Sequence, residues 1–310
     1  MATTKPLSTK KNLLLCLDAF GTLFTPSIPI PVAYARAAAR HGIEDIGNTE
    51  DPREIASRFK RSFRGESKKN PNYGKATQMT VEKWWGNVIH STFAPMLKPT
   101  QRFPQGLVTE LIRTYSSSEG YSLYPDVKPF FNMLRSVKSD SESQSQISTS
   151  TWPWDKTIVG IITNSDSRVP SILSSFDLHV SARRHKARTS TALMEAETAD
   201  INFVIMSYDV GAEKPDAAIF RAAEEMLGDD IQEFEKLYVG DDIEKDYFGA
   251  KYAGWGSLLV RRGVRKLNEE GESSKGIIQI TEKNELGKRR RVDAVESLLD
   301  LGSWQPKQKT

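Results

Sequence analysis

The chain has 310 residues, a length that suits one large domain or two of modest size. Hydrophobic residues make up 38% and charged residues 27%, an ordinary globular composition. The formal net charge is +3, so neither nucleic acid nor a membrane surface is expected as the main partner. The sequence shows no membrane-spanning run and no signal peptide, and the single Cys16 excludes an intramolecular disulfide framework. We therefore expect a soluble protein of the cytoplasm or nucleus.

Short apolar runs alternate with helical patterns over most of the chain. Each run is too short for a helix and ends in polar or glycine residues, which is typical of a strand buried on both faces. Strands separated by helices predict parallel βαβ units and a Rossmann-like, doubly wound α/β sheet. The predicted strands cover residues 11–17, 157–163, 203–207, 236–240 and 257–262, and the helices between them include 169–176 and 217–227.

Residues 25–123 have a different pattern, because apolar residues recur there at helical spacing in 32–42, 51–63 and 81–93. This stretch predicts an all-helical block inserted into the core, with NPNYGK (70–75) as a loop. The predicted domains are a core of 11–24 and 124–262, the helical block at 25–123, disordered or loop insertions at 139–156 and 181–201, and a C-terminal extension at 263–310.

Polar side chains follow four of the predicted strands, at the edge where ligands bind in open parallel sheets. Taken singly, Asp18 could cap a turn, and the acidic group after the fourth strand could cap a helix. Four such groups in this order favour a shared site instead. The candidate residues are Asp18 and Thr22, then Thr163 and Asn164, then Lys214, and finally Asp241, Asp242 and Asp246.

The motifs DAFGTLF, IITNSD, GAEKPDAAIF and GDDIEKDYFGAKYAGW resemble those of the haloacid dehalogenase superfamily of hydrolases, in a eukaryotic or fungal branch with a helical C1 cap. The resemblance implies Asp18 as the nucleophile and Lys214 as its catalytic partner. It implies that Thr22, Thr163 and Asn164 bind the phosphate of a small phosphorylated metabolite. It also implies Mg²⁺, held by Asp18, the backbone carbonyl of Phe20, Asp241, Asp242 and Asp246.

Phe20 departs from the family pattern, because phosphatases of this family have an aspartate there that protonates the leaving group. Loss of a general acid typically costs about 10²–10⁴-fold in rate. Three functions remain open: a weak Mg²⁺-dependent phosphatase, a binding module that has lost catalysis, and a 2-haloacid dehalogenase. The acidic residues Asp241 and Asp242 favour the phosphatase, since dehalogenases of this family need no metal.

Several other residues have both a structural and a functional interpretation. Trp84 and Trp85 are expected either in the core of the cap or in a wall that stacks on the substrate. Tyr73 and Lys75 are candidates to reach the site from the cap. The basic runs at 183–188 and 288–291 are typical of a solvated surface or of a nuclear import signal. Cys16 lies within a predicted strand, so we expect its thiol to be buried.

Overall fold

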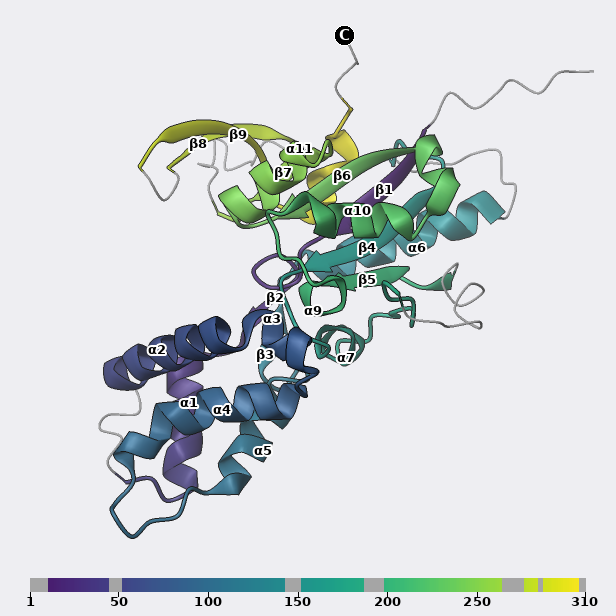
Figure 1. Ribbon diagram of the computed structural model, residues 1–310. Coiled ribbons are helices and arrows are strands. Elements are labelled where there is room, and N and C mark those ends of the chain that lie inside the picture. The colour runs from purple at the N-terminus through teal and green to yellow at the C-terminus, as the bar shows by residue number, and fades with distance from the viewer. Residues whose placement is uncertain are drawn as a thin grey trace, which may run out of the picture.

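The computed structural model describes residues 11–44, 52–142, 152–186, 198–263, 276–283 and 287–306. It consists of an α/β core around a twisted sheet and a helical cap that extends from one edge of that sheet (Figure 1). The predicted Rossmann-like fold is confirmed by this mostly parallel arrangement with helices on both faces. None of the described helices is long and apolar enough to cross a membrane.

The central sheet has seven strands among the described residues. Their order is β5 (Phe203–Met206), β4 (Thr157–Thr163), β1 (Asn12–Leu17), β6 (Phe234–Gly240), β7 (Gly256–Val260), β9 (Arg289–Val295) and β8 (Ile278–Lys283). All neighbours are parallel except β8, which runs antiparallel to β9.

Strand β1 lies in the middle of the sheet and is buried on both faces. Leu13, Leu15 and Leu17 belong to one hydrophobic cluster, and Leu14 and Cys16 belong to another. Successive side chains of a strand point to opposite faces, which is why an uninterrupted apolar run was needed here. The buried thiol predicted at Cys16 is confirmed, and burial raises its pKa well above the usual value.

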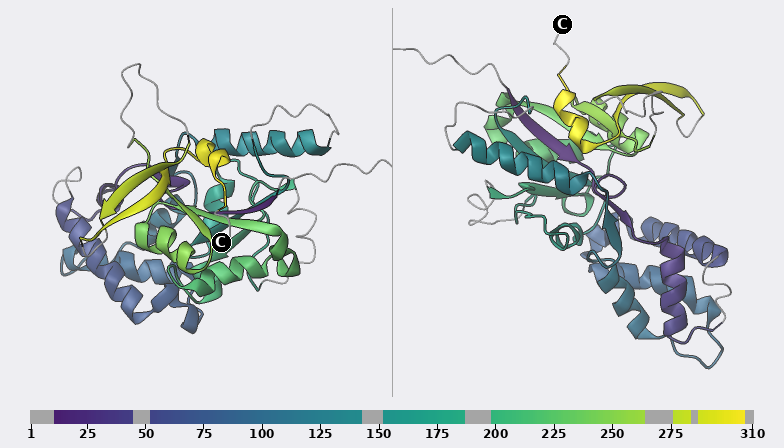
Figure 2. Two further views of the ribbon diagram at one scale, coloured as in Figure 1. Left: turned by 90° about the horizontal axis from the view of Figure 1, so that it is seen from above. Right: turned by 180° about the vertical axis from the view of Figure 1, so that it is seen from behind.

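Helices cover both faces of the sheet (Figure 2). One face is covered by α6 (Val127–Glu142), α7 (Val169–Ser174) and the turn η5 (Leu298–Ser303). The other is covered by α10 (Ala217–Glu225) and α11 (Gly249–Tyr252). Shorter elements of the core are α9 (Ser207–Val210), η3 (Gly228–Glu233) and the π-helical turn η4 (Ile243–Phe248).

The cap lies beyond the carboxyl ends of the strands (Figure 1), and its described residues form four longer helices. The helix predicted at 81–93 has the same bounds in the structure, whereas those predicted at 32–42 and 51–63 correspond to Ile30–Arg40 and Arg53–Lys69. The cap elements are α1 (Ile30–Arg40), α2 (Arg53–Lys69), α3 (Pro71–Gly74), η1 (Lys75–Thr77), α4 (Val81–Phe93), η2 (Ala94–Met96) and α5 (Gln105–Thr114).

Two antiparallel strands connect the cap to the core, namely β2 (Phe24–Pro26) and β3 (Tyr121–Leu123). Phe24 pairs with Leu123, and Pro26 pairs with Tyr121. The two crossings of the chain between cap and core are therefore hydrogen-bonded to each other.

The sheet continues past the predicted limit at residue 262, because β8 and β9 come from the predicted C-terminal extension. Val292 and Ala294 of β9 pack with Leu259 of β7 and Tyr247 in a small core cluster. Strand β9 begins within the basic run at 288–291, which does not resemble a buried strand. Its last residues, Ala294 and Val295, are apolar and pair with β7.

The disordered or loop insertion predicted at 139–156 begins too early, and its end at 152–156 is a loop that packs against the core. Residues 139–142 belong to α6, and Trp152 and Trp154 are buried because their large indole rings pack into the core. The interval 181–201 is likewise ordered at its ends, where Val180 bridges to Ile201 beside β5. Residues 143–151 and 187–197 lie outside the described part of the chain.

Candidate active site

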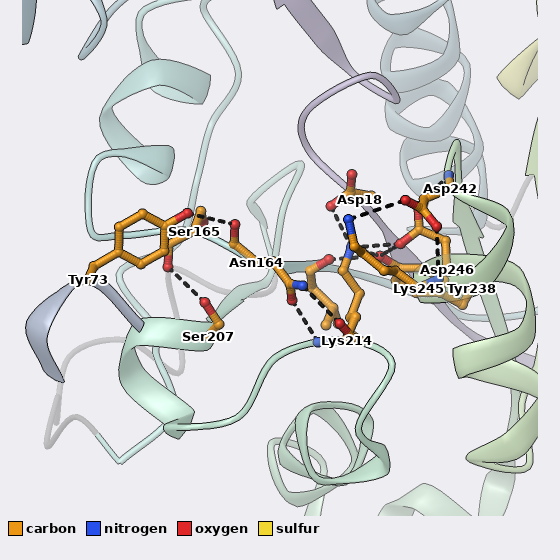
Figure 3. A network of polar contacts seen from close by, with 11 residues as sticks. Asp18, Tyr73, Asn164, Ser165, Ser207, Lys214, Tyr238, Asp242, Lys245 and Asp246 are labelled. Atoms are coloured by element: carbon orange, nitrogen blue, oxygen red, sulfur yellow. Dashed lines mark hydrogen bonds and ion pairs between the residues drawn. The ribbon is translucent and has the colours of Figure 1, made fainter. Parts of the chain in front are cut away.

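The predicted convergence of strand ends occurs at the carboxyl edge of the sheet. Asp18 directly follows β1, and Asp241 directly follows the neighbouring β6. Lys214, from the loop after α9, places its Nζ 2.7 Å from Oδ1 of Asp18 and 2.7 Å from Oδ1 of Asp246 (Figure 3). We refer to Asp18, Lys214, Asp241 and Asp246 as the catalytic edge.

The ammonium group of Lys214 is buried and surrounded by acceptors. Besides the two carboxylates, it donates to the hydroxyl of Tyr238 at 2.7 Å, and Tyr238 in turn donates to the carbonyl of Ile162 at 2.8 Å. Burial alone would lower the pKa of Lys214, but Asp18 and Asp246 outweigh it and raise the pKa. Sequence reasoning missed Tyr238 because a tyrosine inside a strand looks like ordinary core.

Asn164 holds the loop that carries Lys214. Its side-chain Nδ2 donates to the carbonyl of Lys214 at 3.0 Å, and its Oδ1 accepts from the Lys214 amide at 2.7 Å. This side chain therefore positions the lysine loop against β4. Because Nδ2 carries a second hydrogen, phosphate binding by Asn164 stays a prediction.

The two predicted threonines are both buried at strand ends. Thr163 is the last residue of β4, and Thr22 lies in the turn after Asp18. The Thr22 hydroxyl has no hydrogen-bond partner among the described residues, while its carbonyl accepts from Arg262. Their role in phosphate binding stays a prediction.

Three carboxylates of the edge could hold a cation. Asp18, Asp241 and Asp246 each offer an oxygen, and these oxygens all lie within 4.8 Å of one another. A side chain at Gly21 would collide with this group, because a Cβ there would be 2.3 Å from Oδ2 of Asp241. Gly21 also has φ +78°, a conformation that glycine adopts without strain.

The crowding of these carboxylates changes their acidity. Burial raises the pKa of Asp18 to about 7 although Lys214 lowers it, and Asp246 and Asp241 add to the increase. Burial and Asp246 likewise raise the pKa of Asp241. A bound cation would relieve the repulsion, so the donor set fits a hard metal ion such as Mg²⁺.

Asp242 lies apart from this cluster, contrary to the prediction that it binds metal. Its Oδ1 accepts from the amides of Glu244 and Lys245, both at 2.9 Å, and so caps the start of η4. Burial would raise the pKa of Asp242, but these amides and the Lys245 charge lower it. Its own amide donates to Oδ2 of Asp246 at 2.9 Å, so Asp242 fixes the loop that carries the other carboxylates.

The side chain of Phe20 faces the cap. Its ring packs edge-on against Phe24 and Tyr121, with centroids 4.8 and 5.7 Å away. Among the residues that the structure describes, none donates a hydrogen bond to the Phe20 carbonyl oxygen, which leaves that oxygen available as a metal ligand.

A cavity of about 250 Å³ lies between the cap and the core. Phe20 and Asn164 contribute to its wall on the side of the catalytic edge. We call it the aromatic cavity, because its lining includes the rings of Phe20, Tyr34, Phe59, Trp85, Tyr115 and Tyr121.

A buried ion pair forms the floor of the cavity. Arg168 donates to both oxygens of Asp166 at 2.9 Å, and its guanidinium lies 4.7 Å from the ring centre of Trp85. Burial would raise the pKa of Asp166, but Arg168 outweighs it and lowers the pKa. In the sequence, Asp166 is recognisable only as the last residue of the second motif, and nothing there indicates that Arg168 pairs with it.

The cap contacts the core through the 70–75 segment and α4. Tyr73 donates to the carbonyl of Asn164 at 3.1 Å, and Trp85 donates to Asp166 at 2.7 Å. The structure thus brings Tyr73 to the site and puts Trp85 in the cavity wall, while Trp84 is buried in the cap core. Lys75 instead lies over the ring of Tyr208, 5.0 Å from its centre.

Comparison with known proteins identifies the family. A model of haloacid dehalogenase-like hydrolases matches residues 14–254, so the chain belongs to this family of hydrolases. An uncharacterized hydrolase of Schizosaccharomyces pombe is 30% identical over 79% of this chain and 89% of its own length. The haloacid dehalogenase-like hydrolase domain-containing protein 3 of Bos taurus is 24% identical over 80% of this chain and 81% of its own.

Solved structures agree on the fold. An L-2-haloacid dehalogenase superposes with a TM-score of 0.53 over 94% of this chain and 97% of its own, at 12% sequence identity. At this low identity the likeness concerns the fold alone and says nothing of the substrate.

Proposed function

We propose that the protein is a Mg²⁺-dependent phosphatase that acts through a covalent intermediate on Asp18. The observation that carries this proposal is the buried Asp18, held by Lys214 at 2.7 Å beside two further carboxylates. A carboxylate in such a position can attack phosphorus and divide one difficult hydrolysis into two easier steps. The expected substrate is a small phosphorylated metabolite of the cytoplasm or nucleus.

The cation would be held by Asp18, Asp241 and the carbonyl of Phe20. Asp246 would orient them, because its oxygens already accept from Lys214 and the Asp242 amide. When bound, Mg²⁺ supplies positive charge that offsets the phosphate and the crowded carboxylates.

The residues of the chain have distinct tasks in the two steps. Lys214 binds Oδ1 of Asp18, and Oδ2 has no hydrogen bond among the described residues, so it is the attacking atom. In the first step Oδ2 bonds to phosphorus and the bond from phosphorus to the leaving oxygen breaks. In the second step water attacks the aspartyl phosphate, which returns the Asp18 carboxylate and releases inorganic phosphate.

Phe20 makes the first step depend on the leaving group. The phenyl ring of Phe20 cannot protonate the departing oxygen, so substrates with poor leaving groups should react slowly. The same observation supports the second candidate, a binding module that retains the fold and the cation site without turnover.

Phosphate release from acetyl phosphate and 4-nitrophenyl phosphate tests the proposal, with Mg²⁺ or with a chelator. We expect Mg²⁺-dependent release that Asp18→Asn lowers by about 10³-fold or more. Asp177→Asn is the matched control, because Asp177 is an exposed aspartate that pairs only with the exposed Lys128. Release that survives Asp18→Asn would place the nucleophile elsewhere, and no release at all would favour the binding module. The release of halide from 2-chloropropionate without metal would favour a dehalogenase.

A further inference from the structure

The aromatic cavity begins where the catalytic edge ends. Phe20 is two residues from the nucleophile Asp18 and faces the cavity, and Asn164 both lines the cavity and holds the backbone of Lys214. A substrate whose phosphorus lies at Asp18 would therefore extend its leaving group past Phe20 and into this space.

The cavity walls are apolar, and the cavity carries little net charge. Ile89 and Ile112 of the cap and Ile172 of the core line it beside the aromatic rings. Arg168 is the one cation of its lining among the residues that the structure describes, and Asp166 neutralises it through two hydrogen bonds. Charged or strongly hydrated groups would lose solvation here without compensation, which favours an uncharged, apolar occupant.

The cavity wall also carries hydroxyl groups. The buried Ser165 Oγ has no hydrogen-bond partner among the described residues. Tyr121 also lines the cavity, and burial raises its pKa to about 12, so its hydroxyl keeps its proton. Buried polar groups usually have hydrogen-bond partners, so the Ser165 hydroxyl favours an occupant with an oxygen or other polar substituent.

The volume restricts the size of that occupant. A cavity of about 150 Å³ accommodates benzene. The aromatic cavity, at about 250 Å³, therefore has room for one ring with small substituents and is too small for a nucleoside or a long chain.

Phe20 adds an independent chemical argument. A phenol has a pKa of about 10, as the tyrosine side chain shows, whereas an aliphatic alcohol is nearly as weak an acid as water, with a pKa of about 16. A phenoxide can therefore depart without a proton from the enzyme, which an alkoxide does much less readily.

We propose that the aromatic cavity binds the leaving group of the substrate, and that the substrates are phosphate monoesters of single-ring phenols. This inference rests on the proposed phosphatase function. Oδ2 of Asp18 bonds to phosphorus as the bond from phosphorus to the aryl oxygen breaks. The phenoxide then takes a proton from water, and a second water hydrolyses the aspartyl phosphate to inorganic phosphate.

The first test measures binding without turnover, by calorimetry with p-cresol and with glucose as the polar comparison. We expect saturable binding of p-cresol alone, weakened about tenfold or more in Ile112→Trp, whose indole would fill the cavity. Thr109→Trp is the control, because Thr109 is exposed on the same helix α5. Absence of p-cresol binding, or equal binding by both variants, overturns the assignment of the cavity.

The second test compares kcat/KM for 4-methylphenyl phosphate, 4-methylcyclohexyl phosphate and acetyl phosphate. The first two have the same size but differ in leaving group, and acetyl phosphate has no ring. We expect the aryl ester to exceed the cyclohexyl ester by about 10²-fold or more. Ile112→Trp should impair both ring esters and leave acetyl phosphate unchanged, because only the rings need the cavity. Hydrolysis of acetyl phosphate through Asp18 with no preference for the aryl ester overturns this inference and leaves the phosphatase function standing. Failure on all three refutes both.

Discussion

The catalytic edge and the aromatic cavity adjoin each other but differ in how their polar groups are hydrogen-bonded. At the edge, Lys214 is bound by Asp18, Asp246 and Tyr238 at once. In the cavity, the charge of Arg168 is neutralised by Asp166, and the Ser165 hydroxyl has no hydrogen-bond partner in the described part of the chain. The edge is organised before any ligand arrives, which is what electrostatic catalysis requires. The cavity leaves its hydrogen-bonding capacity to a ligand.

Phe20→Asp would change both regions, and it should have the largest effect. A carboxylate beside Asp18 would supply the missing acid and raise Mg²⁺-dependent hydrolysis of alkyl phosphates by about 10²–10⁴-fold. Aryl phosphates should gain less, because their leaving groups need little protonation and the cavity loses a ring. The measurement is kcat/KM on the two ester classes.

Phe20→Asn is the matched control for this gain, since it has a similar shape and no acid. An equal gain from the asparagine variant would show that removing the ring, rather than adding an acid, is responsible. No gain on any phosphate from a folded aspartate variant would refute the missing-acid explanation.

Asp166→Asn should destabilise the fold at the cavity floor. It leaves Arg168 buried without its counter-charge, which typically costs about 3–5 kcal/mol. The fold lowers the pKa of Asp166 below its ordinary value of 3.8. The ion pair therefore stabilises the folded protein fully at pH values above 3.8, and this stabilisation is lost as the pH falls through the lowered pKa. Urea denaturation at pH 7 and near pH 3 measures this difference.

The exposed pair of Lys128 and Asp177 provides the comparison, because Asp177→Asn should change stability by less than about 1 kcal/mol. If Asp166→Asn is equally mild, water or another group compensates Arg168, and the cavity is more polar than we infer.

Tyr238→Phe tests the organisation of the edge. The variant removes an acceptor from Lys214 and a donor from the carbonyl of Ile162, both buried, so we expect a loss of about 1–3 kcal/mol in the free energy of unfolding. Tyr252→Phe is the control, since Tyr252 is exposed. Equal stabilities for the two variants would mean that Lys214 does not need its third partner.

Asp242 gives the smallest expected effect. As a cap of η4, Asp242→Ala should cost about 1 kcal/mol and Asp242→Asn only a few tenths, because asparagine caps nearly as well. Neither should change the Mg²⁺ concentration that gives half-maximal activity, whereas Asp241→Asn should raise it. A large increase with Asp242→Asn would return this residue to the metal ligands.

The order of the polar residues along the chain was sufficient to predict the catalytic edge. Parallel strands place their carboxyl ends together, so Asp18 and Asp241 had to meet once 11–17 and 236–240 were neighbouring strands. Local patterning also predicted α4 residue for residue, because its apolar spacing is contained in the sequence, and in the structure Thr80 caps the start of this helix. The pattern that predicts α4 lies within one short segment, and the pattern that predicts the edge lies in the order of the segments.

Tertiary structure alone decided the roles of individual polar groups. The sequence did not indicate that Asn164 holds the Lys214 backbone or that Asp242 caps η4, because the side chains of Asn and Asp can bond to nearby backbone groups as well as to a ligand.

The aromatic cavity was likewise hidden from the sequence, as was the pairing of β9 with β7. Tyr34, Tyr115 and Arg168 meet only because the cap packs against the edge of the core, and contacts between such distant residues leave no periodic pattern. The sequence by itself determined the fold and the position of Asp18 at the end of the first strand. The folded chain determined what surrounds Asp18, because those contacts depend on how separate segments pack.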